Sequence, residues 1–193
     1  PMPDFTFGWT NTFRYKNFDL SVFINGSYGN KVFNYLGMKL THMNSAWINQ
    51  LNTIADRAQL IPVDANKVYA NGGKWYDDVT NVTVANSATS IPRASIQDPN
   101  DNDRVSDRYV EDGSYIRLKN ITFGYTFPKN MIKKVGLENL RVYANIQNLL
   151  TLTKYEGYDP EIGVSTASAN VYGLDNGRYP SPTVYSFGLN VSF

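Results

Sequence analysis

Side chains that could carry out catalysis are scarce in this chain. The sequence holds one histidine, His42, and no cysteine, so thiol catalysis, disulfides and cysteine-based zinc sites are excluded. A single histidine cannot supply a paired-ligand metal site, and no serine lies in a nucleophile-elbow pattern. No glycine-rich phosphate loop is present either. The sequence therefore favours a protein that is not an enzyme.

A polar stretch over residues 97–112 could bind a metal. Asp98, Asp101 and Asp103 could offer carboxylate oxygens to Ca²⁺. The stretch lacks the glycine and the terminal glutamate of an EF-hand loop. We therefore expect a solvated loop and no cofactor, with a Ca²⁺ site as the alternative.

Aromatic side chains are the remaining candidates for ligand contact. The chain contains 14 Tyr, 10 Phe and 3 Trp, and aromatic rings often line ligand sites. Those in segments predicted to be loops are candidate contacts to a ligand or to a lid-like partner: Trp47, Trp75, Tyr76, Tyr109, Tyr155 and Tyr158, with Tyr172 and Tyr179 beside them. The alternative is that these rings pack the loops together.

Five segments that would position these loops alternate apolar and polar residues with the period of a β-strand. They are residues 5–15, 18–28, 115–127, 139–150 and 185–193. In the last segment the apolar face consists of Tyr185, Phe187, Leu189, Val191 and Phe193. Only Lys16 and Asn17 separate the first two segments, which predicts a tight hairpin.

The length of these segments points to a membrane. Strands of soluble proteins average about 5–6 residues, whereas eleven tilted residues rise roughly 25 Å, the height of the apolar band of an outer-membrane barrel. Arg14, Asp19 and Arg141 all fall on the polar face. The pattern predicts an all-β fold, an antiparallel transmembrane β-barrel wall. The alternative is a soluble β-sandwich with one wet face.

Two charges do not fit this alternation. Arg117 and Lys119 share parity with the apolar Ile121 and Phe123. Either a β-bulge shifts the register near residue 119, or the two charges lie beyond the hydrocarbon. We prefer the second interpretation, because a long loop comes immediately before them. The net charge of +1 gives no strong field for nucleic acid or for anionic lipid.

Loop lengths alternate as in an outer-membrane barrel, with short periplasmic turns and long extracellular loops. The short turns are residues 16–17 and 128–138, and the long loops are residues 29–114 and 151–182. This parity places the C-terminus in the periplasm. Within the first long loop, residues 44–60 show helical spacing and predict a short helix.

Several stretches resemble the C-terminal part of the SusC/RagA family of TonB-dependent outer-membrane transporters. They are SDRYVEDGSYIRLK (Ser106–Lys119), NITFGYTFP (Asn120–Pro128), LRVYANIQNLLTLTKYEGYDPE (Leu140–Glu161) and YSFGLNVSF (Tyr185–Phe193). The resemblance implies that residues 1–193 supply the last five strands of one barrel domain of about 22 strands. We expect the plug and the TonB box to precede residue 1. The terminal apolar row ending at Phe193 resembles an assembly signal, and its residues are expected to face lipid.

The resemblance also implies a function. Members import oligosaccharides or peptides across the bacterial outer membrane, using TonB, as the barrel of a SusCD-like complex. The expected partners are a SusD-like surface lipoprotein, TonB through the upstream segment, outer-membrane lipid and the oligosaccharide or peptide. A dimer of SusCD pairs is a further arrangement that the resemblance allows, and no nucleic acid is expected. The alternatives are a passive porin or structural barrel, and a soluble carbohydrate-binding β-module.

Overall fold

The computed structural model describes residues 1–44, 47–98, 100–161 and 172–193. The chain divides into two compact units: Pro1–Asn34 together with Val110–Phe193, and Tyr35–Tyr109. Among the described residues, no helix has both the length and the apolar character needed to cross a bilayer.

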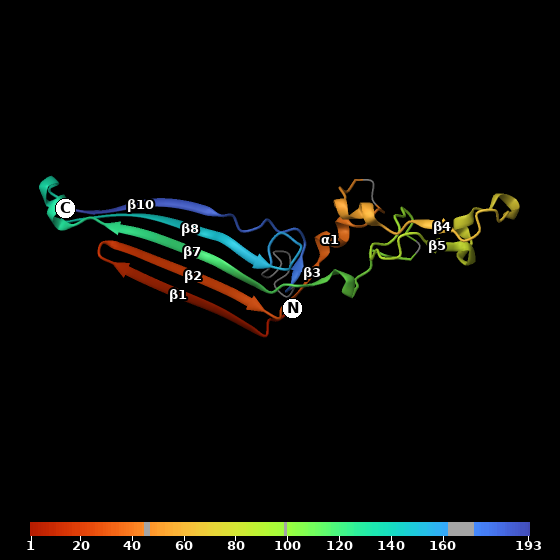
Figure 1. Cartoon of the computed structure of the whole chain (residues 1–193), viewed down its shortest axis with the longest axis horizontal. Helices are drawn as coiled ribbons and strands as arrows, with labels where there is room; N and C mark the ends of the chain where they lie inside the picture. Colours follow the sequence, from red (N-terminus) through yellow and green to blue (C-terminus); the bar gives the residue numbers. More distant parts are fainter. Residues whose placement is uncertain (45–46, 99, 162–171) are drawn as a thin grey trace. The chain divides into compact units, whose positions relative to one another are not determined.

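Five long strands form one antiparallel sheet in the first unit (Figure 1). In sheet order they are β1 (Phe5–Tyr15), β2 (Phe18–Tyr28), β7 (Tyr115–Thr126), β8 (Asn139–Thr153) and β10 (Val184–Ser192). Each long strand pairs with the next long strand along the chain, as in an up-and-down barrel wall. All five predicted strands are confirmed, and β8 continues three residues past its predicted end.

The register of the sheet separates two chemically different faces. One row across all five strands is apolar: Phe13, Leu20, Phe123, Ala144 and Phe187. The adjacent row, on the opposite face, is polar: Thr12, Ser21, Thr122, Asn145 and Ser186. The predicted alternation therefore holds across the strands as well as along them.

The apolar face has no core to cover it. Phe13 is 58% exposed and Phe187 is 84% exposed. The buried apolar residues of the described part of the chain are Val32, Met38, Tyr109, Ile132 and Tyr155, and none of them lies in a long strand. A soluble sandwich would bury this face inside itself, so the fold disagrees with that alternative.

A β-bulge interrupts β7 at Lys119. The register shifts between Phe23 and Ile24 on β2 and between Leu118 and Asn120 on β7, and Lys119 has no partner on either neighbouring strand. Arg117 consequently lies opposite Asn25 on the polar face. Our preferred interpretation, in which the two charges remain on the apolar face beyond the hydrocarbon, is wrong, and the other interpretation, a β-bulge near residue 119, accounts for them.

Both short turns lie at the end of the sheet that holds Phe193 (Figure 1). Lys16 adopts a φ of 53° in the two-residue β1–β2 turn, and the carbonyl of Asn17 accepts a hydrogen bond from the N–H of Thr126 at 2.8 Å. The β7–β8 turn contains the helical segments α2 (Lys129–Ile132) and η6 (Lys133–Val135).

The long connections contain short elements. In the first unit β3 (Lys31–Asn34) lies between β6 (Val110–Asp112) and β9 (Leu174–Asp175). The second unit contains α1 (Tyr35–Leu40), η1 (Asn52–Asp56), β4 (Leu60–Pro62), η2 (Ala70–Gly72), η3 (Trp75–Asp77), η4 (Val79–Asn81), β5 (Val82–Val84) and η5 (Asp107–Tyr109), with β4 and β5 paired.

The helix predicted over residues 44–60 is wrong. In its described part, residues 44 and 47–60, the only helical turn is η1, and residues 45–46 lie outside the described residues. Trp47 and Leu51, two of the apolar residues whose spacing predicted this helix, are 95% and 40% exposed. An amphipathic helix is stabilised mainly by packing of its apolar face, and this stripe has too little packing to sustain one.

Candidate functional site

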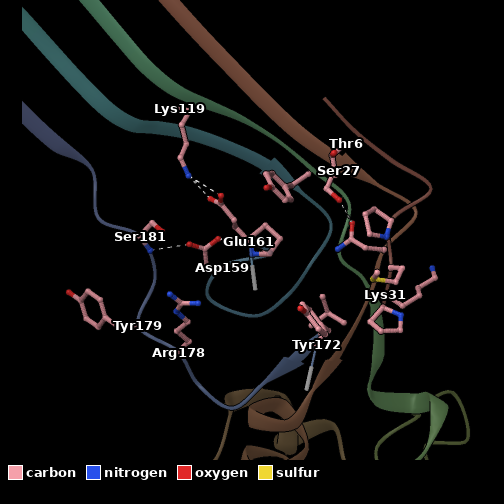
Figure 2. A pocket seen from close by; sticks show the side chains of 18 residues that line it. Thr6, Ser27, Lys31, Lys119, Asp159, Glu161, Tyr172, Arg178, Tyr179 and Ser181 are labelled. Carbon is pink, nitrogen blue, oxygen red and sulfur yellow. Dashed lines mark hydrogen bonds and ion pairs between the residues drawn. The ribbon is translucent and has the colours of Figure 1, made fainter. Parts of the chain in front are cut away.

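A cavity of about 590 Å³ lies on the polar face of the long sheet, in the first unit (Figure 2). Its sheet wall includes one row across three strands, Thr6, Ser27 and Tyr115. The opposite wall comes from residues 159–161 and 172–181, which belong to the connection between β8 and β10. The cavity therefore lies where the long loops meet the sheet.

Arg117 fastens this connection to the sheet. Its side chain is only 3% exposed, and its Nη1 donates to Oε2 of Glu161 at 2.6 Å while Nη2 donates to Oδ1 of Asp159. Nε donates to Oγ1 of Thr151 on β8 at 2.8 Å. Lys119, brought to this face by the bulge, also bonds Glu161, with its Nζ 2.7 Å from Oε2. We call Arg117, Lys119, Asp159 and Glu161 the ion cluster.

Asp159 is held as an anion within the ion cluster. Burial alone would raise its pKa, but the N–H of Ser181, the Arg117 guanidinium and the N–H of Glu161 together outweigh burial and lower the pKa below its ordinary value. Figure 2 shows Ser181 joined to Asp159 and Lys119 joined to Glu161. A buried charge is tolerated when its partners are this complete.

A second contact fastens the same connection. The hydroxyl of Tyr155 donates to Oδ2 of Asp175 at 2.5 Å, and the side chains are 6% and 1% exposed. Burial and the nearby carboxylate raise the pKa of Tyr155 well above its ordinary range. A Cβ at Gly157 would collide with the Tyr155 ring. Thus Tyr155, Gly157, Asp159 and Glu161 of the KYEGYDPE stretch all shape the loop.

The predicted aromatic contacts occupy different environments. Tyr155 and Tyr109 are buried, and the hydroxyl of Tyr109 donates to the carbonyl of Asn102 at 3.3 Å. Trp47 and Tyr158 are highly exposed, at 95% and 63%.

Two further predicted contacts touch each other. The rings of Trp75 and Tyr76 meet edge-on with centroids 5.6 Å apart. Tyr172 and Tyr179 line the cavity. Contact of any of these rings with a ligand stays a prediction.

The second unit holds a cluster that bears on the Ca²⁺ prediction. The atoms that one ion could reach belong to His42, Asp98 and Asp103, within 4.8 Å of one another, so His42 stands where we expected Asp101. Nδ1 of His42 accepts the N–H of Asn44 at 3.2 Å, which leaves Nε2 to donate to Oδ2 of Asp98 at 3.0 Å.

Hydrogen bonds already occupy the Asp98 carboxylate of this cluster. Oδ2 of Asp98 also accepts the N–H of Asn102 at 2.6 Å, and Oδ1 accepts the Asn102 side-chain amide at 2.7 Å. Ca²⁺ prefers oxygen ligands, whereas this cluster offers one imidazole, the engaged carboxylate of Asp98 and the carboxylate of Asp103, which accepts the side-chain amide of Asn44 at 3.4 Å. Hydrogen bonds among these residues therefore stabilise the loop. The alternative of a Ca²⁺ site here stays a prediction.

The chain is similar over its whole length to TonB-dependent receptors. It is 36% identical over 198 residues to TonB-dependent receptor P3 of Formosa agariphila and 27% identical over 196 residues to TonB-dependent receptor SusC of Bacteroides thetaiotaomicron, covering 100% of this chain in both cases. This chain is SusC-like. It spans 17% and 15% of the length of those two relatives. No protein-family model matches the chain.

Solved structures share the fold of the SusC-like chain. The RagAB peptide importer in the closed-closed state matches with a TM-score of 0.70 and 22% identity, and the open-open state matches with 0.66 and 20%. Each match covers 100% of this chain and 17% of the other. The relatives are receptors and transporters, and none of these names denotes an enzyme.

The sequence prediction missed the ion cluster of the SusC-like chain. The signal was present in two places: the break in alternation at Arg117 and Lys119, and the acidic pair Asp159 and Glu161 after the next strand. Only the register, in which Arg117 lies opposite Thr151, shows that these two irregularities belong together.

Proposed function

We propose that the SusC-like chain is part of the wall and the extracellular loops of an outer-membrane barrel that imports oligosaccharides or peptides in a TonB-dependent manner. The observation that carries the proposal is the apolar face of the long sheet. It is continuous over five strands and is not covered by any described part of the chain.

Hydrocarbon is the environment that this face fits. Burial of apolar surface is favourable by about 25 cal/mol per Å², and exposed patches above a few hundred Å² are rare on soluble monomers. Rings such as Trp9, Phe13 and Phe187 are 57%, 58% and 84% exposed. A bilayer would cover them, and the polar row on the other face would line the interior of the barrel.

The proposed arrangement of the chain follows from its connections. Residues 1–193 form part of one barrel domain, with the plug and the TonB box upstream. The connections over 29–114 and 151–182 face outward, and the short turns and Phe193 face the periplasm. The support is that both short turns lie at the same end of the sheet.

The nutrient and the partners are inferred from chemistry and from the names of relatives. The cavity beside the ion cluster offers both signs of charge and two exposed rings, Tyr172 and Tyr179. Such a lining suits a peptide or an oligosaccharide, and the solved structures are described as a peptide importer. A SusD-like lipoprotein would meet the outward loops, where Trp47, Tyr179 and Tyr158 are the most exposed of the predicted aromatic contacts. TonB would bind the upstream segment.

Uptake by cells that carry the complete receptor tests the proposal. Labelled peptide and oligosaccharide pools are offered to cells with TonB, without TonB, and with the membrane potential collapsed. The expected result is uptake of one pool that disappears in both deficient conditions. Uptake that persists without TonB would overturn the proposal in favour of a passive pore. A purified receptor that stays monodisperse without detergent would favour the soluble module.

A further inference from the structure

The turn between β7 and β8 concentrates positive charge at one end of the sheet. Lys129, Lys133 and Lys134 are exposed, and none of them forms an ion pair with a described residue. The turn, residues 127–138, holds one carboxylate, that of Glu138. We call this segment the basic turn. The balanced charge of the whole chain conceals this local excess.

The basic turn also exposes apolar side chains while remaining anchored. Met131 is 59% exposed and Val135 is 72% exposed, four residues apart, whereas Ile132 is 3% exposed. The N–H of Leu137 donates to the carbonyl of Ile132 at 3.3 Å, and Gly136, with a φ of 77°, ends the helical segment. A short helical segment with lysines and exposed apolar side chains suits a membrane interface, where both can be satisfied.

A groove of about 570 Å³ lies near the same end of the sheet. Its lining from the apolar face is Phe123, Tyr125, Val142, Ala144, Phe187 and Leu189. The small side chain of Ala144 lies between Phe123 on β7 and Phe187 on β10, so two rings flank a shallow floor. The groove follows β8, which begins directly after the basic turn.

The basic turn and the groove are close enough to bind a single lipid molecule. Val142 lies three residues into β8, or roughly 10 Å along the strand from its start. The α2 helix of the basic turn contacts β8. A lipid with its phosphate at the lysines could therefore extend an acyl chain into the groove.

We propose that the basic turn and the groove form a binding site for an anionic phospholipid of the leaflet that contacts the short turns. This inference rests on the proposed function, because it requires the apolar face to lie in a bilayer. Lys133 and Lys134 would bind the phosphate, Met131 and Val135 would lie at the interface, and one acyl chain would cover Ala144. Charge complementarity selects an anionic over a zwitterionic lipid.

Photolabelling of the complete receptor tests this site. The receptor is reconstituted in nanodiscs of phosphatidylcholine with a trace of photoactivatable phosphatidylglycerol, and labelled peptides are identified by mass spectrometry. We expect label on residues 127–146. The double variant K133Q/K134Q should reduce this label roughly tenfold to thirtyfold. Lys154→Gln, an exposed lysine after β8 that forms no ion pair with a described residue, is the matched control and should leave it unchanged.

A second pair of variants tests the groove. Ala144→Phe fills the floor and should shift the label away from β8, whereas Val22→Phe, on the apolar face of β2, should not. Excess soluble glycerol phosphate should fail to compete, since a free anion lacks the acyl chain. Equal labelling by a photoactivatable phosphatidylcholine, or label unaffected by K133Q/K134Q, would overturn the inference.

Photolabelling together with the uptake assay in cells separates this inference from the proposed function. If the control variants enter nanodiscs and support TonB-dependent uptake in cells while K133Q/K134Q leaves the label unchanged, only the lipid site is refuted. If the wild-type receptor and every variant fail to enter the bilayer, the proposed function fails.

Discussion

Arg117 joins the long sheet to the connection between β8 and β10. Its guanidinium contacts Asp159 and Glu161 of the loop, and its Nε contacts Thr151 of the neighbouring strand. A planar, always-charged guanidinium suits such a buried junction of two carboxylates better than an ammonium does. The loop beside the cavity is therefore held by few side chains, and each can be tested alone.

Replacement of Arg117 by methionine should weaken the attachment of residues 159–161 to the sheet, while the other residues of the ion cluster remain. The change leaves Asp159 buried without its cation, and removal of one partner of a buried pair costs on the order of 3 kcal/mol. Hydrogen exchange of the amides of Glu161 and Ser181 should accelerate correspondingly in the complete receptor. Arg178→Met, an exposed arginine in the same connection, should leave the exchange unchanged. Unchanged protection in Arg117→Met would show that the ion cluster does not hold the loop.

The lowered pKa of Asp159 predicts that protection of the loop amides depends on pH. Its pKa in the folded protein lies below the ordinary value of 3.8, so its stabilising effect is fully present above that value and is lost as pH falls through the folded pKa. Protection of the Ser181 amide should therefore hold from neutral pH to about pH 4 and then decline. In Asp159→Asn, protection should be lower at neutral pH and lack this acidic step. A step in the variant as large as in the wild type would assign the titration to another group.

The long strands could be predicted from the sequence because their environment repeats every two residues. Each face of β10 has the same environment along its whole length. The alternation of apolar and polar residues in this one sequence is therefore enough to predict the strand. The bulge at Lys119 and the loop elements lack such repetition. Their positions depend on partners distant in the chain, such as Arg117 with Asp159. The false helix over residues 44–60 shows the same limit, because an apolar stripe predicts a helix only where something packs on it.

The two faces of β10 predict opposite responses to a new charge. Phe187 lies near the middle of the strand on the apolar face, opposite Ala144. Phe187→Arg should destabilise the assembled barrel by about 2–4 kcal/mol, as expected for an arginine facing lipid at mid-depth. Ser186→Arg, one residue away and facing the interior, should be much milder. The measurement is the yield of heat-modifiable, folded receptor in outer membranes, and equal losses would mean that the faces are assigned wrongly.

At the scale of the whole chain, the long sheet has no core of its own, because none of the buried apolar residues of the described chain lies in its strands. Its apolar rows continue from β1 to β10, and both edge strands have one neighbour in the described chain. Unpaired edges invite further pairing, and a closed barrel satisfies them. The sequence predicted only part of the candidate site. It identified the loops, but the position of the cavity depends on the register of the sheet and on the contacts that hold residues 159–161 against it.

The accessibility of single labelled positions along β10 tests the central claim most directly. Spin labels are placed one at a time at residues 185–191 of the complete receptor in a bilayer, starting from a cysteine-free background; this chain contributes no cysteine. Collisions with oxygen, which concentrates in hydrocarbon, should peak at odd positions, and collisions with a water-soluble nickel reagent should peak at even positions. Accessibility that does not alternate, or odd positions open to water, would contradict the account.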